Sequence, residues 1–203
     1  MPCAQRLNGC VNEAQRNAML IERLSRAMAR GEELAAAGLA AAVTGLILLN
    51  VAFRAAGHPL YWVSELAIYA MIWMTFLIAS AVLKRRQSLT VTLLVDALPA
   101  RARALMRALV DVVVLAFALV LVWLCWRWYQ PLALWRAGFD VAAFQGETFN
   151  FIYAENTSTL GIKKFWCWLI VPWFALSLTL HASANLLLRL SRRSARGSSE
   201  ASA

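Results

Sequence analysis

The chain has 203 residues, of which 61% are hydrophobic and only 15% are charged, whereas about 25% of the residues of an ordinary soluble domain are charged. The net charge of +9 would suit a nucleic-acid-binding protein, but the basic residues lie in clusters between long apolar runs, which argues against that class. Apolar runs close to the roughly 20 residues that cross a bilayer as a helix recur along the chain. The composition therefore predicts an integral membrane protein.

Four apolar runs are long enough to cross a membrane. A helix satisfies the hydrogen bonds of its own backbone, which the absence of water in the hydrocarbon layer requires. We therefore expect an all-α protein whose membrane domain, residues 34–190, contains four transmembrane helices. The expected spans cover about residues 34–56, 65–83, 108–129 and 165–190.

The distribution of basic residues predicts the orientation of these helices. Fifteen of the twenty Lys and Arg residues precede the first span, separate the second from the third, or follow the fourth. Basic residues are enriched on the cytoplasmic side of membrane proteins, so both termini are expected in the cytoplasm. Tryptophan, which is enriched at membrane interfaces, supports this orientation. Seven tryptophans lie near the outer ends of the spans: Trp62, Trp123, Trp126, Trp128, Trp135, Trp166 and Trp168.

Residues 1–33 form a basic leader. It is too long for the first part of a signal peptide and no small-residue cleavage pattern follows it, so we expect the first span to be retained. Its apolar residues share one helical face while arginines dominate the rest, as in an amphipathic helix on an anionic membrane; a solvated leader is the alternative. The apolar residues are Leu20, Ile21, Leu24 and Met28, and the arginines are Arg16, Arg23, Arg26 and Arg30.

Polar residues gather where the first span ends and the second begins. Asn50 and Arg54 lie four residues apart on one helical face, where they could contact another helix or subunit, or Arg54 could reach the outer headgroups while Asn50 is satisfied locally. A turn is expected at residues 57–59, followed by Trp62 at the interface. Glu65 opens the second span, where the helix dipole favours a carboxylate; alternatively it pairs with a cation on another helix.

The connection between the second and third spans starts with the basic residues 84–86 and ends at Pro99. Apolar and polar residues alternate within it, and we expect an interfacial amphipathic segment under the bundle with a turn at Asp96. Asp111, just inside the third span, is expected to pair with Arg107, four residues earlier.

The outer loop, residues 130–164, is the longest connection. It contains four phenylalanines and Tyr153 among polar residues, so we expect it to be ordered and either functional or docked on something. Cys125 and Cys167 lie near its two ends, where a disulfide is conceivable, although a free cysteine is also a common core residue.

The fourth span carries Pro172, which should kink the helix or free a carbonyl. In its inner half a polar stripe recurs every four residues, formed by Ser177, His181, Asn185 and Arg189. The stripe could line a path, or it could bond the helices to one another. The tail at residues 191–203 is rich in Ser, Ala and Arg and is expected to be disordered.

The sequence offers little to an enzyme. His58 and His181 are its only histidines, so neither a two-histidine haem site nor a His-rich metal site is expected. It has no phosphate-binding glycine loop and no nucleophile elbow. We expect no catalysis, no cofactor and no metal.

An ordered set of short motifs resembles one family of transport proteins. The motifs are NVAFR (50–54), PLYWVSEL (59–66), KRRQSLTV (84–91), LLVDALP (93–99) and STLGIKK (158–164). In this order they are similar to the small membrane subunit of tripartite ATP-independent periplasmic (TRAP) transporters, the DctQ-like family. The chain departs from that family at Ser88 and Thr92, where a His and an Asp are common, and at Lys163 and Lys164, where a Pro often follows the Ile.

The resemblance implies a four-helix subunit of the bacterial inner membrane. Such a subunit braces a large elevator-type membrane subunit, which carries the substrate and sodium sites, while a periplasmic binding protein delivers an organic acid. The candidate residues for contact with the large subunit are Asn50, Arg54, Trp62, Glu65 and Asp96.

Two other functions stay open. The chain could be a stand-alone transporter, a homodimer with Glu65 as the coupling carboxylate, although Glu65 lies at the membrane margin and coupling sites are expected near the midplane. It could also be a membrane assembly or anchoring protein without a transport role.

Overall fold

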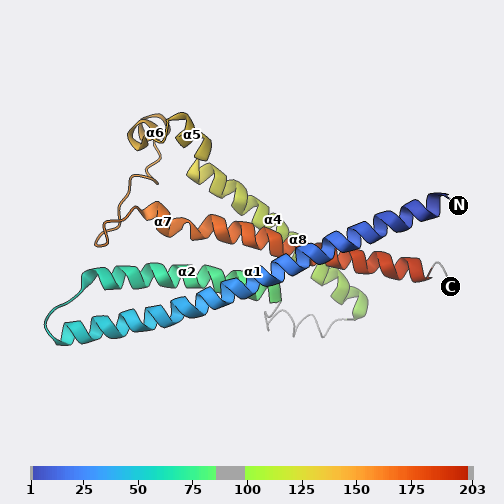
Figure 1. Ribbon diagram of the computed structural model, residues 1–203, viewed down its shortest axis with the longest axis horizontal. Coiled ribbons are helices and arrows are strands. Elements are labelled where there is room, and N and C mark those ends of the chain that lie inside the picture. The colour runs from blue at the N-terminus through green and yellow to red at the C-terminus, as the bar shows by residue number, and fades with distance from the viewer. Residues whose placement is uncertain (1, 86–98, 201–203) are drawn as a thin grey trace. The chain divides into compact units, whose positions relative to one another are not determined.

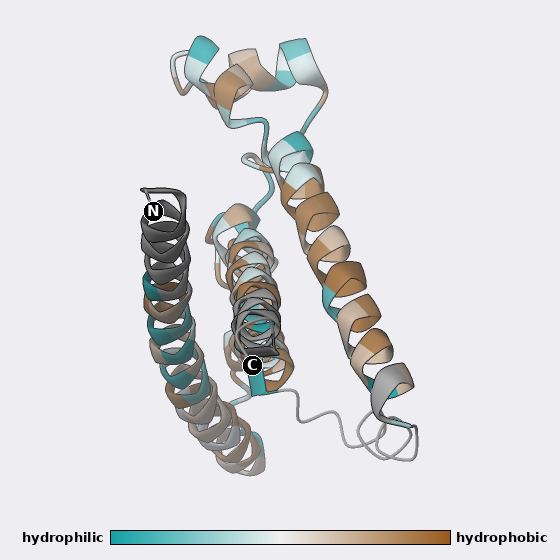
Figure 2. Ribbon diagram, turned by 90° about the vertical axis from the view of Figure 1, so that its right-hand side faces the viewer, coloured by the Kyte–Doolittle hydropathy of each residue, from teal (hydrophilic) through white to brown (hydrophobic). Residues whose placement is uncertain are grey.

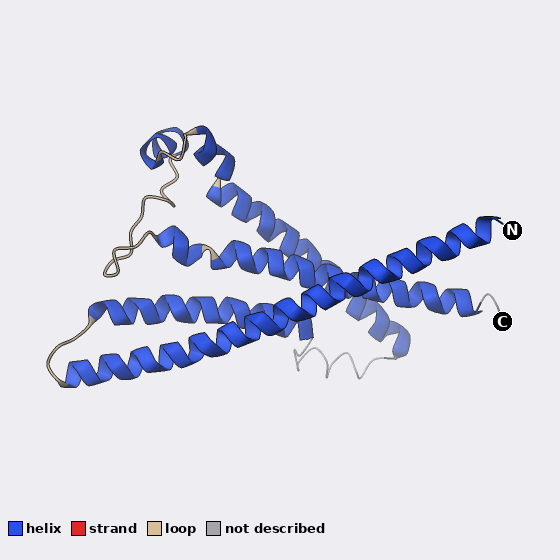
Figure 3. Cartoon of the chain, viewed as in Figure 1, coloured by secondary structure: helices blue, strands red, loops and turns tan. Residues whose placement is uncertain are grey.

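The computed structural model describes residues 2–85 and 99–200, and helices dominate both parts (Figures 1 and 3). Within these residues there is no strand, only an isolated antiparallel bridge between Asn156 and Lys163. The helices are α1 (Pro2–Ala55), α2 (Tyr61–Arg85), α4 (Ala100–Tyr129), α5 (Pro131–Arg136), α6 (Val141–Thr148), α7 (Lys164–Trp168) and α8 (Ile170–Glu200).

Four stretches are long and apolar enough to cross a membrane, which confirms the predicted all-α, four-span architecture. Hydrophobic residues occupy most of α4 (brown in Figure 2). Apolar side chains on it, such as Phe117, which is 57% exposed, are expected on a helix that faces lipid or another protein. The four spans are Met19–Ala55, Tyr61–Arg85, Ala102–Arg136 and Lys164–Arg189.

The leader and the first span form one uninterrupted helix, α1 (Figure 1). No break marks the expected boundary between residues 33 and 34. The reason is local: residues 27–43 are rich in Ala, Leu, Arg and Glu, which are strong helix formers, and the single glycines among them cost only about 1 kcal/mol each.

The C-terminal end also differs from the expectation. The sequence predicts disorder from Ser191, whereas α8 continues to Glu200. Ala and Arg have high helix propensity, and extending an existing helix avoids the cost of nucleating a new one.

The turn between α1 and α2 forms where the sequence predicts it. Gly57 adopts a left-handed conformation, with φ of 79°, which glycine reaches without steric cost. Two hydrogen bonds close the end of α1, from the Gly57 amide to the Arg54 carbonyl (3.1 Å) and from the His58 amide to the Phe53 carbonyl (2.9 Å). This pattern satisfies carbonyls that a helix end would otherwise leave without donors.

The chain divides into two compact units, and each of the four long helices contributes a segment to both. We call one the terminal unit, because it contains both ends of the chain, and the other the loop unit, because it contains the loop at residues 130–163. The terminal unit is Met1–Gly31, Ser80–Leu119 and Leu176–Ala203; the loop unit is Glu32–Ala79 and Val120–Ala175.

The core of the loop unit joins three helices. Ala36 of α1, Leu77 of α2 and Ile170 of α8 are buried together. The helix breaks between α7 and α8, near Pro172 as the sequence predicts, and the carbonyl of Cys167 at this break accepts a hydrogen bond from the Trp73 indole at 2.8 Å. This bond replaces the intrahelical one that the break removes.

Candidate functional site

Glu65 lies in the second turn of α2 and binds a loop of its own chain. Its carboxylate accepts hydrogen bonds from the backbone amides of Ser158 (2.8 Å), Thr159 (2.6 Å) and Leu160 (3.1 Å). The Thr159 hydroxyl adds a fourth bond at 2.5 Å. Successive amides that converge on one anion form a backbone nest, and charge-assisted bonds of this kind are stronger than neutral ones.

The loop that receives Glu65 is a hairpin, residues 155–164. The Thr157 amide donates to the Ile162 carbonyl at 2.8 Å, and the Ile162 amide donates to the Thr157 hydroxyl at 3.0 Å. Gly161 takes a φ of 69° at the tip, and Lys164 pairs with Glu155 at 3.2 Å across the open end. Glu65 therefore holds a preformed turn against α2.

This geometry differs from both readings of Glu65 in the sequence. The described contacts are with backbone amides and a hydroxyl of its own chain, which neither interpretation named. The amides lie 93 to 95 residues further along the chain. Two of the motifs that carry the family resemblance, PLYWVSEL and STLGIKK, thus meet at this point.

The other candidate interface residues lie around the α1–α2 turn. The Asn50 amide donates to the Ser64 hydroxyl at 2.9 Å, so it joins α1 to α2. Arg54 is exposed and lines a cavity of about 320 Å³ together with Asn50 and Tyr61. Trp62 is 43% exposed. Asp96 lies outside the described residues.

In the terminal unit, each member of the polar stripe on α8 contacts another helix. Ser177 bonds Ser80 of α2 at 2.6 Å, and Nδ1 of His181 bonds the Ser25 hydroxyl of α1 at 2.7 Å. Both pairs are buried. Of the two roles that the sequence left open for the stripe, these contacts favour bonding between helices over a path.

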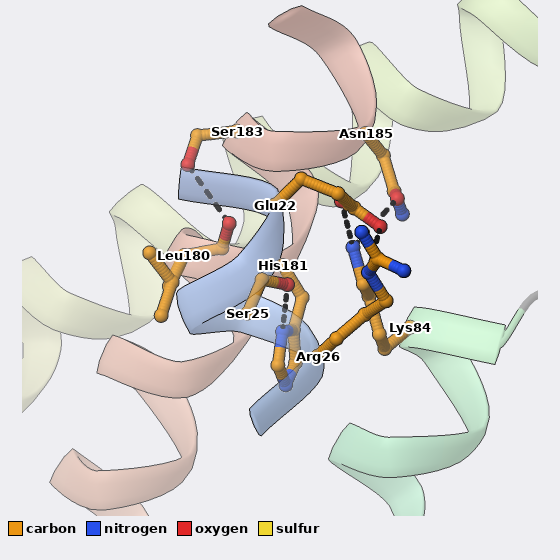
Figure 4. Close-up of polar contacts among 8 residues, drawn as sticks. All are labelled: Glu22, Ser25, Arg26, Lys84, Leu180, His181, Ser183 and Asn185. Atoms are coloured by element: carbon orange, nitrogen blue, oxygen red, sulfur yellow. Dashed lines mark hydrogen bonds and ion pairs between the residues drawn. The ribbon is translucent and has the colours of Figure 1, made fainter. Parts of the chain in front are cut away.

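A charged cluster continues the stripe (Figure 4). Lys84, at the end of α2, lies between Glu22 of α1 at 2.5 Å and the Asn185 amide oxygen of α8 at 3.4 Å. Its side chain is only 6% exposed, and that of Glu22 is 15% exposed. Arg26 contacts Glu22 at 3.3 Å but remains 59% exposed. We call Glu22, Lys84 and Asn185 the charged clasp.

The last member of the stripe gives Asp111 a partner that the sequence did not predict. Arg189 pairs with Asp111 of α4 at 3.1 Å and also donates to the Ala104 carbonyl at 3.4 Å. The sequence assigned Asp111 to Arg107, whose side chain lies outside the described part of the chain. A spacing of four residues makes a pair possible, but the packing of α4 on α8 supplies a second cation.

The sequence did not single out Glu22 or Ser25. Both lie on α1 among the basic residues of the leader, three residues apart and hence on one helical face. The available signal was this pair of polar residues on one face of α1, which could face the four-residue stripe of α8.

The loop between α4 and α7 is docked on its own unit. The Tyr153 hydroxyl donates to the Tyr129 carbonyl at 2.7 Å, and its ring contacts Phe144 and Phe165 with centroids 5.4 Å away in each case. Burial raises the pKa of the Tyr153 hydroxyl, which keeps it protonated and able to donate. The expectation of an ordered loop is thereby met in residues 130–163.

The described residues form neither a metal-binding cluster nor a disulfide. No group of three or more His, Cys, Asp and Glu side chains within them could hold a metal ion. Cys125 and Cys167 are buried and free, so the conceivable disulfide is not formed.

A comparison with protein families now bears on the function. The family model described as "Tripartite ATP-independent periplasmic transporters, DctQ component" matches residues 43–192, about three quarters of the chain. The chain belongs to the DctQ family. Neither a curated protein nor a solved structure gave a significant match.

Membership of the DctQ family makes the chain a small membrane component of a TRAP transporter, in a family of transporter components rather than enzymes. DctQ proteins work in tripartite complexes with a large membrane subunit and a periplasmic binding protein. The matched region contains Glu65, its hairpin and the α8 stripe, whereas Glu22 and Ser25 precede it. In the contacts of the leader with α2 and α8, the leader residues are therefore outside the part that this DctQ chain shares with the family model, and their partners Lys84 and His181 are inside it.

Proposed function

We propose that this DctQ chain braces the large elevator-type subunit of a TRAP transporter of the bacterial inner membrane. The complex would take up an organic acid together with sodium, after a periplasmic protein delivers the substrate. The proposal rests on one observation: in the polar stripe of α8, Ser177, His181 and Asn185 bond to neighbouring helices of the same chain. A subunit with internally bonded helices suits a static scaffold, while the transport sites lie in the partner.

The partner surface that we propose lies at the α1–α2 turn. Arg54 and Trp62 are exposed there and free to contact a second protein, whereas Asn50 and Glu65 already bond within the chain. We assign Asn50 and Glu65 the role of shaping that surface. Asp96 stays a candidate for contact at the other end of α2.

Co-expression with the large subunit tests the proposal. We expect the two proteins to purify as a stable complex, and Trp62→Ala to weaken complex formation by about tenfold, since a buried interface aromatic typically contributes 1–2 kcal/mol or more. The transported substrate should not change. Trp62→Phe, which keeps an aromatic ring, serves as the control and should lose less.

Two outcomes would overturn the proposed role. Proton-coupled uptake by this chain alone in liposomes would identify a stand-alone transporter, in which Glu65 would have to leave its four hydrogen bonds to bind a proton. Failure to bind any large subunit, with correct insertion, would favour an assembly or anchoring protein.

The proposed topology places both termini in the cytoplasm, with residues 1–33 as a cytoplasmic leader and residues 191–203 as a cytoplasmic tail. An alkaline phosphatase fusion at Ala203 should therefore be inactive, because the enzyme requires export to fold. A fusion at Gly146, in α6, should be active. Strong activity at Ala203 with none at Gly146 would mean that the orientation is reversed.

A further inference from the structure

Two phenylalanines of the α4–α7 loop combine an unfavourable backbone conformation with high exposure. Phe139 has a φ of 63° and is 67% exposed; Phe149 has a φ of 53° and is 81% exposed. Left-handed backbone at a helix end usually belongs to Gly or Asn, because Cβ clashes there in other residues. In water, each position thus has two costs in free energy: the left-handed backbone of a residue with a Cβ, and the exposure of an apolar ring.

Hydrogen bonds at two helix ends accompany this backbone. After α5, the Phe139 amide donates to the Leu134 carbonyl and the Gly138 amide to the Trp135 carbonyl, both at 3.0 Å, which is the Schellman pattern of a helix end. Its left-handed position is Gly138, with φ of 63°, and Phe139 repeats this backbone one residue later. After α6, the Phe149 amide donates to the Gln145 carbonyl at 3.0 Å. Both phenylalanines therefore belong to hydrogen-bonded helix ends.

Phe139 extends an exposed apolar face of α5. Leu132 and Trp135 lie three residues apart on this helix and are 56% and 72% exposed. The rings of Trp135 and Phe139 are in contact, with centroids 6.2 Å apart. We call Leu132, Trp135, Phe139 and Phe149 the aromatic anchor.

Its place in the chain and its charges indicate what covers it. α5 begins two residues after Tyr129, the last residue of α4. Leu132 and Trp135 belong to the last five residues of the apolar stretch Ala102–Arg136, so the anchor lies where that stretch ends. Arg127 and Arg136 flank it and are exposed, as suits a layer of lipid phosphates. The nearby carboxylate of Asp140 caps α6 by accepting hydrogen bonds from the amides of Ala142 and Ala143.

We propose that the aromatic anchor inserts into the boundary between lipid headgroups and acyl chains, and so fixes α5 and α6 on the membrane surface. Exposed Trp and Phe beside Arg is the composition of interfacial membrane anchors. Contact of the rings with lipid then offsets the free-energy cost of the two left-handed phenylalanines. A monomer in water has no such contact. Insertion of the anchor into lipid requires neither orientation of the chain in particular nor the proposed bracing role.

Site-directed spin labelling of the full chain in vesicles tests this proposal. Single cysteines at positions 132, 139 and 149 are introduced into a variant with the four native cysteines replaced, and each labelled protein is reconstituted in phosphatidylcholine–phosphatidylglycerol vesicles. We expect the ratio of collisions with oxygen to collisions with a water-soluble nickel complex to be at least about fivefold higher at these positions than at Glu147, an exposed polar position on α6. Helix content by circular dichroism checks that each labelled variant is folded.

Two results would contradict the proposal. Equal access of the nickel complex to positions 139, 149 and 147 in vesicles would mean that the rings face water. Protection of positions 139 and 149 only after the large subunit is added would mean that a protein, and not lipid, covers the anchor.

Discussion

Glu65→Gln is expected to release the hairpin at residues 155–164 from α2. The carboxylate accepts from the amides of Ser158, Thr159 and Leu160 and from the Thr159 hydroxyl, and a glutamine side chain has one oxygen and a donor group that would face these donors. Hydrogen exchange at the three amides should accelerate on the order of tenfold, since local opening governs exchange in an exposed turn. Mass spectrometry of the full chain in detergent or nanodiscs measures this directly.

The effect on transport should follow from the release of the hairpin. Complex formation with the large subunit should weaken and uptake should fall, while the preferred substrate stays the same. Glu147→Gln, which removes an exposed carboxylate from α6, is the matched control and should leave exchange at residues 158–160 unchanged. Thr159→Val, which deletes one of the four donors, should give an intermediate effect. A changed substrate profile in Glu65→Gln would mean that this chain contributes to the substrate site.

Glu22→Gln is expected to destabilise the terminal unit by roughly 3 kcal/mol, because breaking a buried ion pair leaves an uncompensated charge. The Lys84 ammonium is 6% exposed and would keep only the long contact to Asn185. A loss of this size should lower the midpoint of thermal unfolding by roughly 5–10 °C in a chain of this length. Thermal unfolding of the purified protein in detergent, followed by thiol labelling of the buried cysteines, gives the midpoint.

A double variant separates the ion pair from other causes. Glu22→Gln combined with Lys84→Met removes both charges and should recover much of the lost stability, since a buried pair is often replaceable by apolar groups. Arg26→Gln is the control: its side chain is 59% exposed, and an exposed pair contributes less than about 1 kcal/mol. If the two clasp substitutions instead add their effects, the charged clasp is not a coupled unit.

These two sites join helices within each unit. In the loop unit, Glu65 ties the loop between α6 and α7 to α2. In the terminal unit, α8 bonds to α1 through His181, to α2 through Ser177 and to α4 through Arg189. Each contact joins segments far apart in the sequence, so each restricts the movement of one helix against another.

Much of the fold could be predicted from the sequence because it depends on local rules. A run of about 20 apolar residues must form a helix in lipid to satisfy its backbone, and this gave four spans close to those observed. The turn at Gly57 and the break near Pro172 also follow from the conformational limits of single residues. Helix ends were less predictable: α1 extends through the leader and α8 through most of the tail. Both segments are rich in residues of high helix propensity, and extending an existing helix avoids the cost of nucleating a new one.

The partners of the polar residues were decided only by the tertiary structure. Helical periodicity places His181 and Asn185 on one face, but it does not say that Ser25 and Lys84 lie opposite. The sequence presents Lys84 as the first residue of a basic stop, yet its side chain is buried against Glu22, 62 residues away. Glu65 is likewise a plausible dipole partner until the amides of Ser158 and Thr159 are brought to it. A membrane helix is determined by its own residues, whereas a polar contact between two helices depends on how they cross and on which residues that crossing brings together.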